Sequence, residues 1–101
     1  MRHSVATLEE LEQRGQLCRT VGGVKLLILR TEDGIYALEN RCTHAELPLA
    51  GGLVEEGSIR CPAHGARFKL ATGEPCQGGR LEAVTTYPVA VVDGMVEVTL
   101  A

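Results

Sequence analysis

Residues 42–44 read Cys-Thr-His, and residues 61–65 read Cys-Pro-Ala-His-Gly, with sixteen residues between His44 and Cys61. Each stretch carries one cysteine and one histidine, so together they offer two thiolates and two imidazoles. The chain contains four cysteines and three histidines, and more than half of these side chains fall in the two stretches. The pattern indicates a metal centre that neither stretch could hold alone.

Two kinds of metal centre use two cysteines and two histidines. One is a tetrahedral zinc ion in a Cys₂His₂ site. The other is a [2Fe–2S] cluster with two cysteines on one iron and two histidines on the other. Zinc fingers pair cysteine with cysteine and histidine with histidine, whereas here each stretch mixes the two types, as C-x-H and C-x-x-H. Mixed pairs let each stretch reach both irons, which favours the cluster; a structural zinc-binding interaction module is the alternative.

The two motifs resemble the cluster-binding boxes of Rieske proteins. The resemblance covers most of the chain from about residue 16 onward and includes Pro48-Leu49, Gly51-Gly52, Gly65-Ala66-Arg67-Phe68, Thr72-Gly73 and Thr86-Tyr87-Pro88-Val89. It implies an all-β fold, in which an antiparallel β-sandwich base carries a small cluster-binding lobe formed by two loops. It also implies one [2Fe–2S] cluster, with Cys42 and Cys61 on the inner iron and His44 and His64 on the outer iron. The histidines would lie near the surface, where an electron can pass to a partner.

The chain departs from the respiratory members of that family at four positions. Those members have an extra cysteine in each box, joined as a disulfide, where this chain has Leu47 and Ala63. They also have Ser and Tyr hydroxyls that donate to cluster sulfurs, where this chain has Ala66 and Phe68. Such hydrogen bonds stabilise the reduced cluster. We therefore expect a potential toward the lower end of the Rieske range of about −150 to +300 mV.

The resemblance implies a soluble one-electron carrier, which is not itself an enzyme. Its expected partners are a flavin-dependent reductase as electron donor and an oxygenase or another terminal enzyme as acceptor. A small subunit of a reductase complex such as nitrite reductase is the alternative within the family. An oxygenase itself is not expected, because only His3 remains after the cluster takes two histidines. The mononuclear iron of such enzymes needs two histidines and a carboxylate.

The composition is that of one ordinary globular domain, residues 1–101, with 45% hydrophobic and 23% charged residues. A net charge of −3 argues against nucleic acid as a partner. The sequence shows neither a signal-peptide pattern nor a run of about 18 apolar residues. We therefore expect a monomeric cytoplasmic protein with no membrane partner. Cysteines in that compartment serve as ligands or free thiols, and we interpret Cys18 and Cys76 as inert thiols.

Gly-Gly and Asp-Gly pairs at residues 22–23, 33–34 and 93–94 predict three β-hairpins. The strands that they connect are predicted at residues 17–21, 24–29, 35–38, 89–92 and 95–100. Residues 24–29 are almost continuously apolar, which is typical of a strand buried on both faces. Residues 96–100 alternate apolar and polar side chains, as in a half-buried strand.

The ends and the middle of the chain differ in pattern. Thr7 and Glu10 have the spacing of a capping box, which predicts a helix of one or two turns. Residues 41–79 are rich in Gly, Pro, Ala and Cys, with short strands predicted only at residues 58–60 and 67–70. We expect residues 4–40 and 80–101 to form the base and residues 41–79 to form the cluster-binding lobe.

Overall fold

The computed structural model describes residues 1–42, 48–62, 66–76 and 82–100. These residues form antiparallel sheets and one short helix, which confirms the predicted all-β fold. The strand orders of the sheets are β1-β10-β9, β2-β3-β4-β8 and β5-β6-β7. The elements are β1 (Arg2–Thr7), α1 (Leu8–Arg14), β2 (Gln16–Val21), β3 (Val24–Thr31), β4 (Gly34–Glu39), β5 (Leu53–Glu55), β6 (Ser58–Arg60), β7 (Arg67–Lys69), β8 (Thr86–Tyr87), β9 (Val89–Val92) and β10 (Met95–Thr99).

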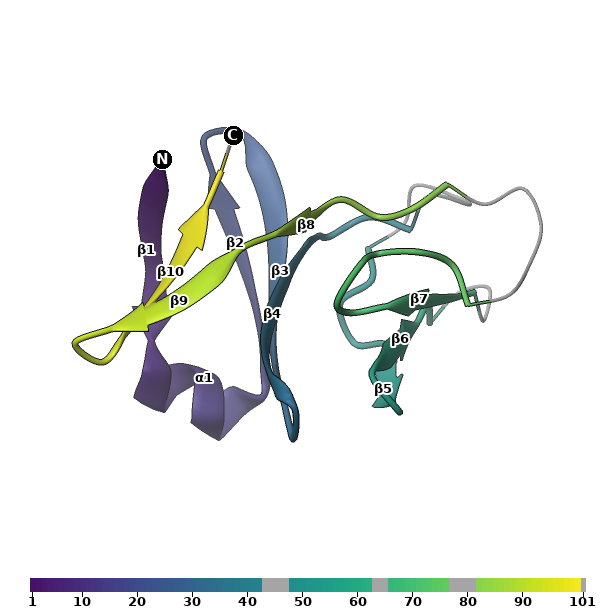
Figure 1. Cartoon of the computed structure of the whole chain (residues 1–101), viewed down its shortest axis with the longest axis horizontal. Helices are drawn as coiled ribbons and strands as arrows, with labels where there is room; N and C mark the ends of the chain where they lie inside the picture. The colour runs from purple at the N-terminus through teal and green to yellow at the C-terminus, as the bar shows by residue number, and fades with distance from the viewer. Residues whose placement is uncertain (43–47, 63–65, 77–81, 101) are drawn as a thin grey trace.

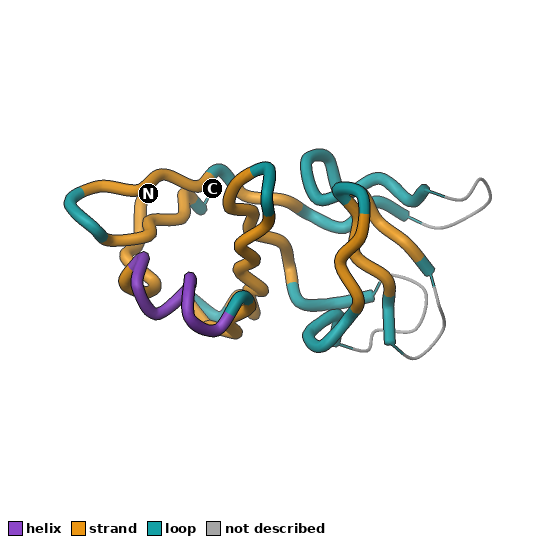
Figure 2. Tube along the Cα trace, turned by 90° about the horizontal axis from the view of Figure 1, so that it is seen from below, coloured by secondary structure: helices purple, strands orange, loops and turns teal. Residues whose placement is uncertain are grey.

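The β2-β3-β4-β8 sheet is the middle layer of the molecule. Figures 1 and 2 show the β1-β10-β9 sheet on one side of it and the small β5-β6-β7 sheet on the other. The first two sheets form the predicted sandwich base, and the β5-β6-β7 sheet lies at the far end of the long axis. The position of this third sheet matters for function because both cysteine motifs lie next to it in the chain. Strand β4 of the middle sheet leads into the first motif, and strand β6 of the third sheet leads into the second.

Strand β3 explains why the base can carry a second structure. Its four central residues, Leu26 to Leu29, are at most 1% exposed. Side chains alternate between the faces of a strand: Leu27 and Leu29 pack with the β5-β6-β7 sheet, whereas Leu26 and Ile28 pack with the β1-β10-β9 sheet. Burial of each such side chain contributes about 1.5–3 kcal/mol. The prediction of a strand buried on both faces is therefore confirmed.

The buried side chains form two separate cores. The lobe core consists of Leu27, Leu29, Leu38, Cys42, Leu49, Ile59, Cys61, Ala66, Phe68, Leu70 and Val84. The base core consists of Val5, Ala6, Leu11, Leu17, Leu26, Ile28, Ala37, Val96, Val98 and Leu100. Both cysteines of the two motifs belong to the lobe core, so the candidate metal centre lies on one side of the middle sheet.

The three predicted hairpins are confirmed by the pairing of β2 with β3, β3 with β4, and β9 with β10. In the last of these turns Asp93 has φ 49° and Gly94 has φ 76°. Positive φ at both central residues is the geometry that a two-residue hairpin requires. Strand β10 alternates as predicted: Val96 and Val98 are fully buried, whereas Met95, Glu97 and Thr99 are half-buried.

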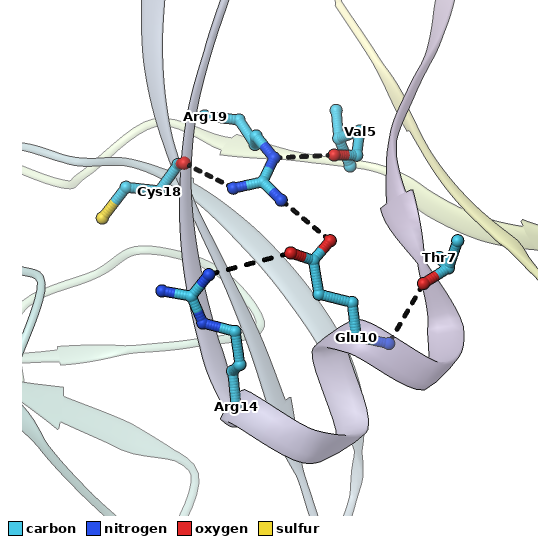
Figure 3. A network of polar contacts seen from close by, with 6 residues as sticks. All are labelled: Val5, Thr7, Glu10, Arg14, Cys18 and Arg19. Atoms are coloured by element: carbon cyan, nitrogen blue, oxygen red, sulfur yellow. Dashed lines mark hydrogen bonds and ion pairs between the residues drawn. The ribbon is translucent and has the colours of Figure 1, made fainter.

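Helix α1 begins at the predicted N-cap. The Glu10 amide donates to the Thr7 hydroxyl at 3.1 Å, and the helix ends when the Gly15 amide donates to the Leu11 carbonyl at 2.7 Å. The Glu10 carboxylate pairs with Arg19 of β2 at 2.9 Å and Arg14 at 3.7 Å (Figure 3). Its side chain thus joins the helix to the middle sheet. No helix within the described residues is long and apolar enough to cross a membrane.

Strands β1 and β5 were not predicted from the sequence. Strand β1 reads RHSVAT, and only Val5 and Ala6 in it are buried. Its pairing with β10 contains an irregularity between Ser4 and Ala6, which interrupts the alternation of side chains. Strand β5 has only three residues, and it pairs with β6 across the turn at residues 56–57. Both strands therefore depend on pairing rather than on a local pattern.

Candidate metal centre

Cys42 and Cys61 follow the ends of two strands and turn into the same core. Cys42 comes three residues after the end of β4 and is 0% exposed, and Cys61 directly follows β6 and is 1% exposed. All four cysteines lie within the described residues, and none of them forms a disulfide. Cys18 and Cys76 are exposed, unlike the pair in the motifs. The structure therefore separates the two motif cysteines from the other two by burial.

The second motif is positioned by the β6–β7 hairpin. The Cys61 amide donates to the Ala66 carbonyl at 2.7 Å, which closes the loop between the strands. Phe68 of β7 is opposite Ile59 of β6, and both side chains are 0% exposed in the lobe core. Phe68 thus packs in the same apolar core as Cys61.

The first motif is held at its base by Asn40. The Asn40 side-chain oxygen accepts hydrogen bonds from the Leu49 amide at 2.9 Å and the Ala50 amide at 3.0 Å. The Asn40 amide donates to the Lys25 carbonyl of β3 at 2.8 Å. One side chain therefore joins the chain just before Cys42 to the chain just after the motif, and the Asn40 backbone is anchored on the middle sheet.

Gln16 of β2 supports the same segment from another strand. Its side-chain oxygen accepts from the Gly51 amide at 3.1 Å, and its nitrogen donates to the Gly52 carbonyl at 3.2 Å. A side chain at Gly52 would clash, because its Cβ would lie 2.3 Å from the Arg60 carbonyl oxygen. We call Asn40 and Gln16 the amide clamp. Neither residue is predicted from the sequence as part of the site.

The return from the lobe to the base is held by a close backbone contact. The Val84 amide donates to the Gly73 carbonyl at 2.8 Å. Gly73 has φ 79°, and a Cβ there would lie 1.8 Å from the Val84 carbonyl oxygen. Beyond this segment, Tyr87 of β8 is partly buried. The pKa of its phenol is raised above the usual value, mainly by this burial and to a lesser extent by the nearby carboxylate of Glu39. Tyr87 therefore packs as a neutral side chain of the base.

The other predicted site residues lie outside the described residues. They are His44, Leu47, Ala63 and His64. Within the described part of the chain, no group of three or more His, Cys, Asp or Glu side chains is placed to hold a metal ion. Cys42 and Cys61 are thus two of the predicted donors, brought into one core, and the histidine donors are not located by this structure.

The surroundings of Cys42 and Cys61 fit an iron–sulfur cluster. Thiolates are the ligands of such clusters, and both thiols are buried without being paired in a disulfide. The side chains that share their core are apolar, and they include Ala66 and Phe68, neither of which carries a hydroxyl. An apolar shell limits access of solvent to a metal centre and so controls its potential.

A model of the Rieske [2Fe-2S] domain matches residues 1–88, which include both motifs. The chain belongs to the Rieske [2Fe-2S] domain family. The resemblance inferred from the two motifs is thereby confirmed, and the cofactor of the protein is one [2Fe–2S] cluster. Cys42 and Cys61 are the described residues suited to hold it, and the cluster supplies reversible uptake of a single electron.

Relatives and solved structures agree with this assignment. The chain is 31% identical over 98 residues to the anthranilate 1,2-dioxygenase ferredoxin subunit of Burkholderia cepacia, covering 97% of this chain and 91% of that protein. The ferredoxin of carbazole 1,9a-dioxygenase from Nocardioides aromaticivorans matches with a TM-score of 0.90 and 31% identity, covering 100% and 99% of the two chains. A ferredoxin solved in complex with carbazole 1,9a-dioxygenase oxygenase matches with a TM-score of 0.84 and 28% identity, covering 96% and 91%. The protein is accordingly an electron-transfer component and not a catalytic enzyme.

Proposed function

We propose that this protein is a Rieske-type ferredoxin that carries single electrons from a flavin-dependent reductase to an oxygenase. The observation that carries the proposal is the placement of Cys42 and Cys61, two buried cysteines that form no disulfide, in one apolar core. The relatives support it, because they are named as ferredoxin subunits of dioxygenases and one was solved bound to its oxygenase.

We propose Cys42, His44, Cys61 and His64 as the cluster ligands. The two cysteines come from segments that the amide clamp and the β6–β7 hairpin hold against the middle sheet. The two histidines follow Cys42 by two residues and Cys61 by three, so the same two segments would deliver them. Neutral imidazoles in place of thiolates leave the cluster less negative, which raises its potential above that of all-cysteine clusters.

We further propose a low-potential cluster in a soluble, monomeric, cytoplasmic protein. Ala66 and Phe68 offer no hydroxyl to stabilise the reduced cluster, which supports the low potential. In this proposal residues 1–101 form a single Rieske domain, with a base at residues 4–40 and 80–101 and a cluster-binding lobe at residues 41–79.

The alternative acceptor is a nitrite reductase, of which the chain would be the small subunit. Two solved small subunits share this fold with TM-scores of 0.87 and 0.88, but at 17% and 19% identity the likeness concerns the fold alone. A free carrier should be active as an isolated monomer, whereas a fixed subunit should be inert outside its complex.

Metal analysis of cysteine and histidine variants tests the proposed function. The wild-type protein should be red-brown, with two irons and two labile sulfides per chain. Cys42→Ser, Cys61→Ser, His44→Ala and His64→Ala should each lose this cluster. The matched controls Cys18→Ser, Cys76→Ser and His3→Ala should keep it.

Electron transfer is then measured with a purified flavin reductase of a dioxygenase system. The wild-type protein should be reduced and reoxidised by an oxygenase over many turnovers. A colourless protein with one zinc ion would overturn the cluster. A red-brown protein that passes electrons only inside a nitrite reductase complex would overturn the proposed acceptor.

A further inference from the structure

The outer face of the β5-β6-β7 sheet carries a row of three residues that the lobe core does not use. Strand register places Leu53 opposite Arg60, and Arg60 opposite Arg67. Their neighbours Ile59 and Phe68 point into the lobe core. Because side chains alternate along each strand, Leu53, Arg60 and Arg67 all lie on the opposite face of this sheet. The sheet itself lies at the end of the long axis that is remote from helix α1 and β1 (Figure 1).

The two arginines in this row have no anionic partner among the described residues. Like charges directly opposite each other destabilise a sheet, yet neither Arg60 nor Arg67 forms an ion pair or a side-chain hydrogen bond within that part of the chain. Other arginines do pair with a glutamate; they are Arg2, Arg14, Arg19, Arg30 and Arg41. The row therefore carries two positive charges that no carboxylate of the described residues neutralises in an ion pair, in a chain whose net charge is −3.

The row borders a hollow that reaches a proposed cluster ligand. The hollow has a volume of about 470 Å³ and is lined by Gly51, Leu53, Arg60, Cys61 and Pro62. Leu53 is 55% exposed, more than Val91 or Val92 of strand β9. An apolar side chain, an unpaired cation and a depression thus meet directly beside Cys61, although Cys61 itself is only 1% exposed.

We propose that Leu53, Arg60, Pro62 and Arg67, which we call the lobe face, form a docking surface for an acidic patch on the acceptor oxygenase. This proposal rests on the proposed function. Two unpaired cations would attract and orient a carboxylate-rich surface, and Leu53 would supply the apolar centre that protein interfaces bury. The negative remainder of the chain would repel the same surface, so the partner would be turned toward the lobe and the cluster.

Variants of the lobe face test the proposal by steady-state reduction of a probe oxygenase. The probe is the oxygenase of the anthranilate 1,2-dioxygenase system of Burkholderia cepacia, with the intact cluster-loaded protein as its reductant. At low salt the double variant Arg60→Glu, Arg67→Glu should raise KM about tenfold, because steering of this kind changes association about 10- to 1,000-fold. Leu53→Ser should raise KM several-fold, and kcat should change in neither variant.

Matched controls exclude effects of charge and hydrophobicity elsewhere. Arg2→Glu makes on β1 the same change in charge as either single substitution of the double variant, and Val92→Ser removes an exposed apolar side chain on β9. Both should leave KM unchanged. The difference between the double variant and wild type should shrink as salt rises, because exposed charges are screened. Reduction of each variant by the reductase should match wild type, since the lobe face is assigned to the acceptor.

Each other outcome overturns the proposal in a different way. A fall in kcat with a shifted potential and an unchanged KM would mean that the arginines tune the cluster and do not dock a partner. Equal losses with the reductase and the oxygenase would overturn the assignment to the acceptor. Unchanged KM in all variants, with normal transfer by wild type, would overturn the lobe face alone. Failure of wild type to reduce the oxygenase would overturn the carrier function and the lobe face together.

Discussion

Ala66 and Phe68 are buried beside Cys61 and offer no hydroxyl group, which makes them the residues to change when the potential is tested. We predict that Ala66→Ser with Phe68→Tyr raises the reduction potential. Each new hydroxyl that reaches a cluster sulfur would favour the reduced state by about 1 kcal/mol, or about 40 mV for one electron. A redox titration of wild type, both single variants and the double variant measures the shift.

Ala71→Ser is the control for this experiment, because Ala71 lies exposed in the turn after β7 and the substitution should leave the potential unchanged. An unchanged potential in the double variant would mean that positions 66 and 68 do not face the cluster sulfurs. Phe68 is 0% exposed, so a hydroxyl there without a partner should lower the free energy of unfolding. The two readouts therefore separate a hydroxyl that bonds to sulfur from one that is merely buried.

The sequence predicts the metal-binding residues of the site better than it predicts the residues that hold them in place. Cys42 and Cys61 are recognisable because thiol and imidazole donors recur at fixed short spacings. The amide clamp follows no such pattern: Gln16 meets Gly51 and Gly52, which are 35 and 36 residues away in the chain. Asn40 carries a faint signal, since Asn at a strand end often bonds to nearby backbone. Contacts that only the folded chain creates cannot be inferred from local residue types.

At the scale of elements, the amide clamp joins the middle sheet to the segment after the first motif. We predict that Asn40→Leu lowers the free energy of unfolding by about 1–3 kcal/mol, because the Leu49 and Ala50 amides lose their acceptor. The cluster should also be released faster to an iron chelator. Urea unfolding and the decay of visible absorbance measure the two effects.

Asn40→Asp is the matched rescue, because a carboxylate keeps the acceptor oxygens that face the two amides. It should restore most of the stability and slow the release of the cluster relative to Asn40→Leu. The Asn40 side-chain nitrogen also lies 3.7 Å from the Cys18 sulfur. If Asp proved as harmful as Leu, that contact and not the acceptor oxygen would be the part of Asn40 that matters.

Elements differ in how far the sequence predicts them. Strand β3 is predictable, because burial on both faces demands a continuous apolar run and the residues provide it. The hairpins are predictable from turn residues that tolerate positive φ. Strand β1 is not, because its partner β10 lies at the other end of the chain and its register is irregular. The elements that the sequence hides are those whose stability comes from distant pairing.

At the scale of the whole molecule, β3 divides the interior into the base core and the lobe core. The base core contains neither Cys42 nor Cys61. Its outer sheet pairs β1, near the start of the sequence, with β10, near its end. The lobe core includes both cysteines and is enclosed by the three short strands of the β5-β6-β7 sheet. The lobe strands have only three residues each, and the lobe core contains both cysteines. Because metal binding couples to folding, the lobe should depend on the cluster more than the base does.

Removal of the cluster should therefore loosen the lobe and spare the base. We predict that amides of Ile59 and Phe68 exchange with solvent at least about tenfold faster in the cluster-free protein, a loss of about 1.4 kcal/mol in local stability. Amides of Ile28 and Val96 in the base should keep their protection. Hydrogen–deuterium exchange on chelator-treated protein, repeated on Cys42→Ala, Cys61→Ala protein, measures both regions at once. An equal rise in both would mean that the two cores unfold together across β3, so that the cluster stabilises the entire domain and not the lobe alone.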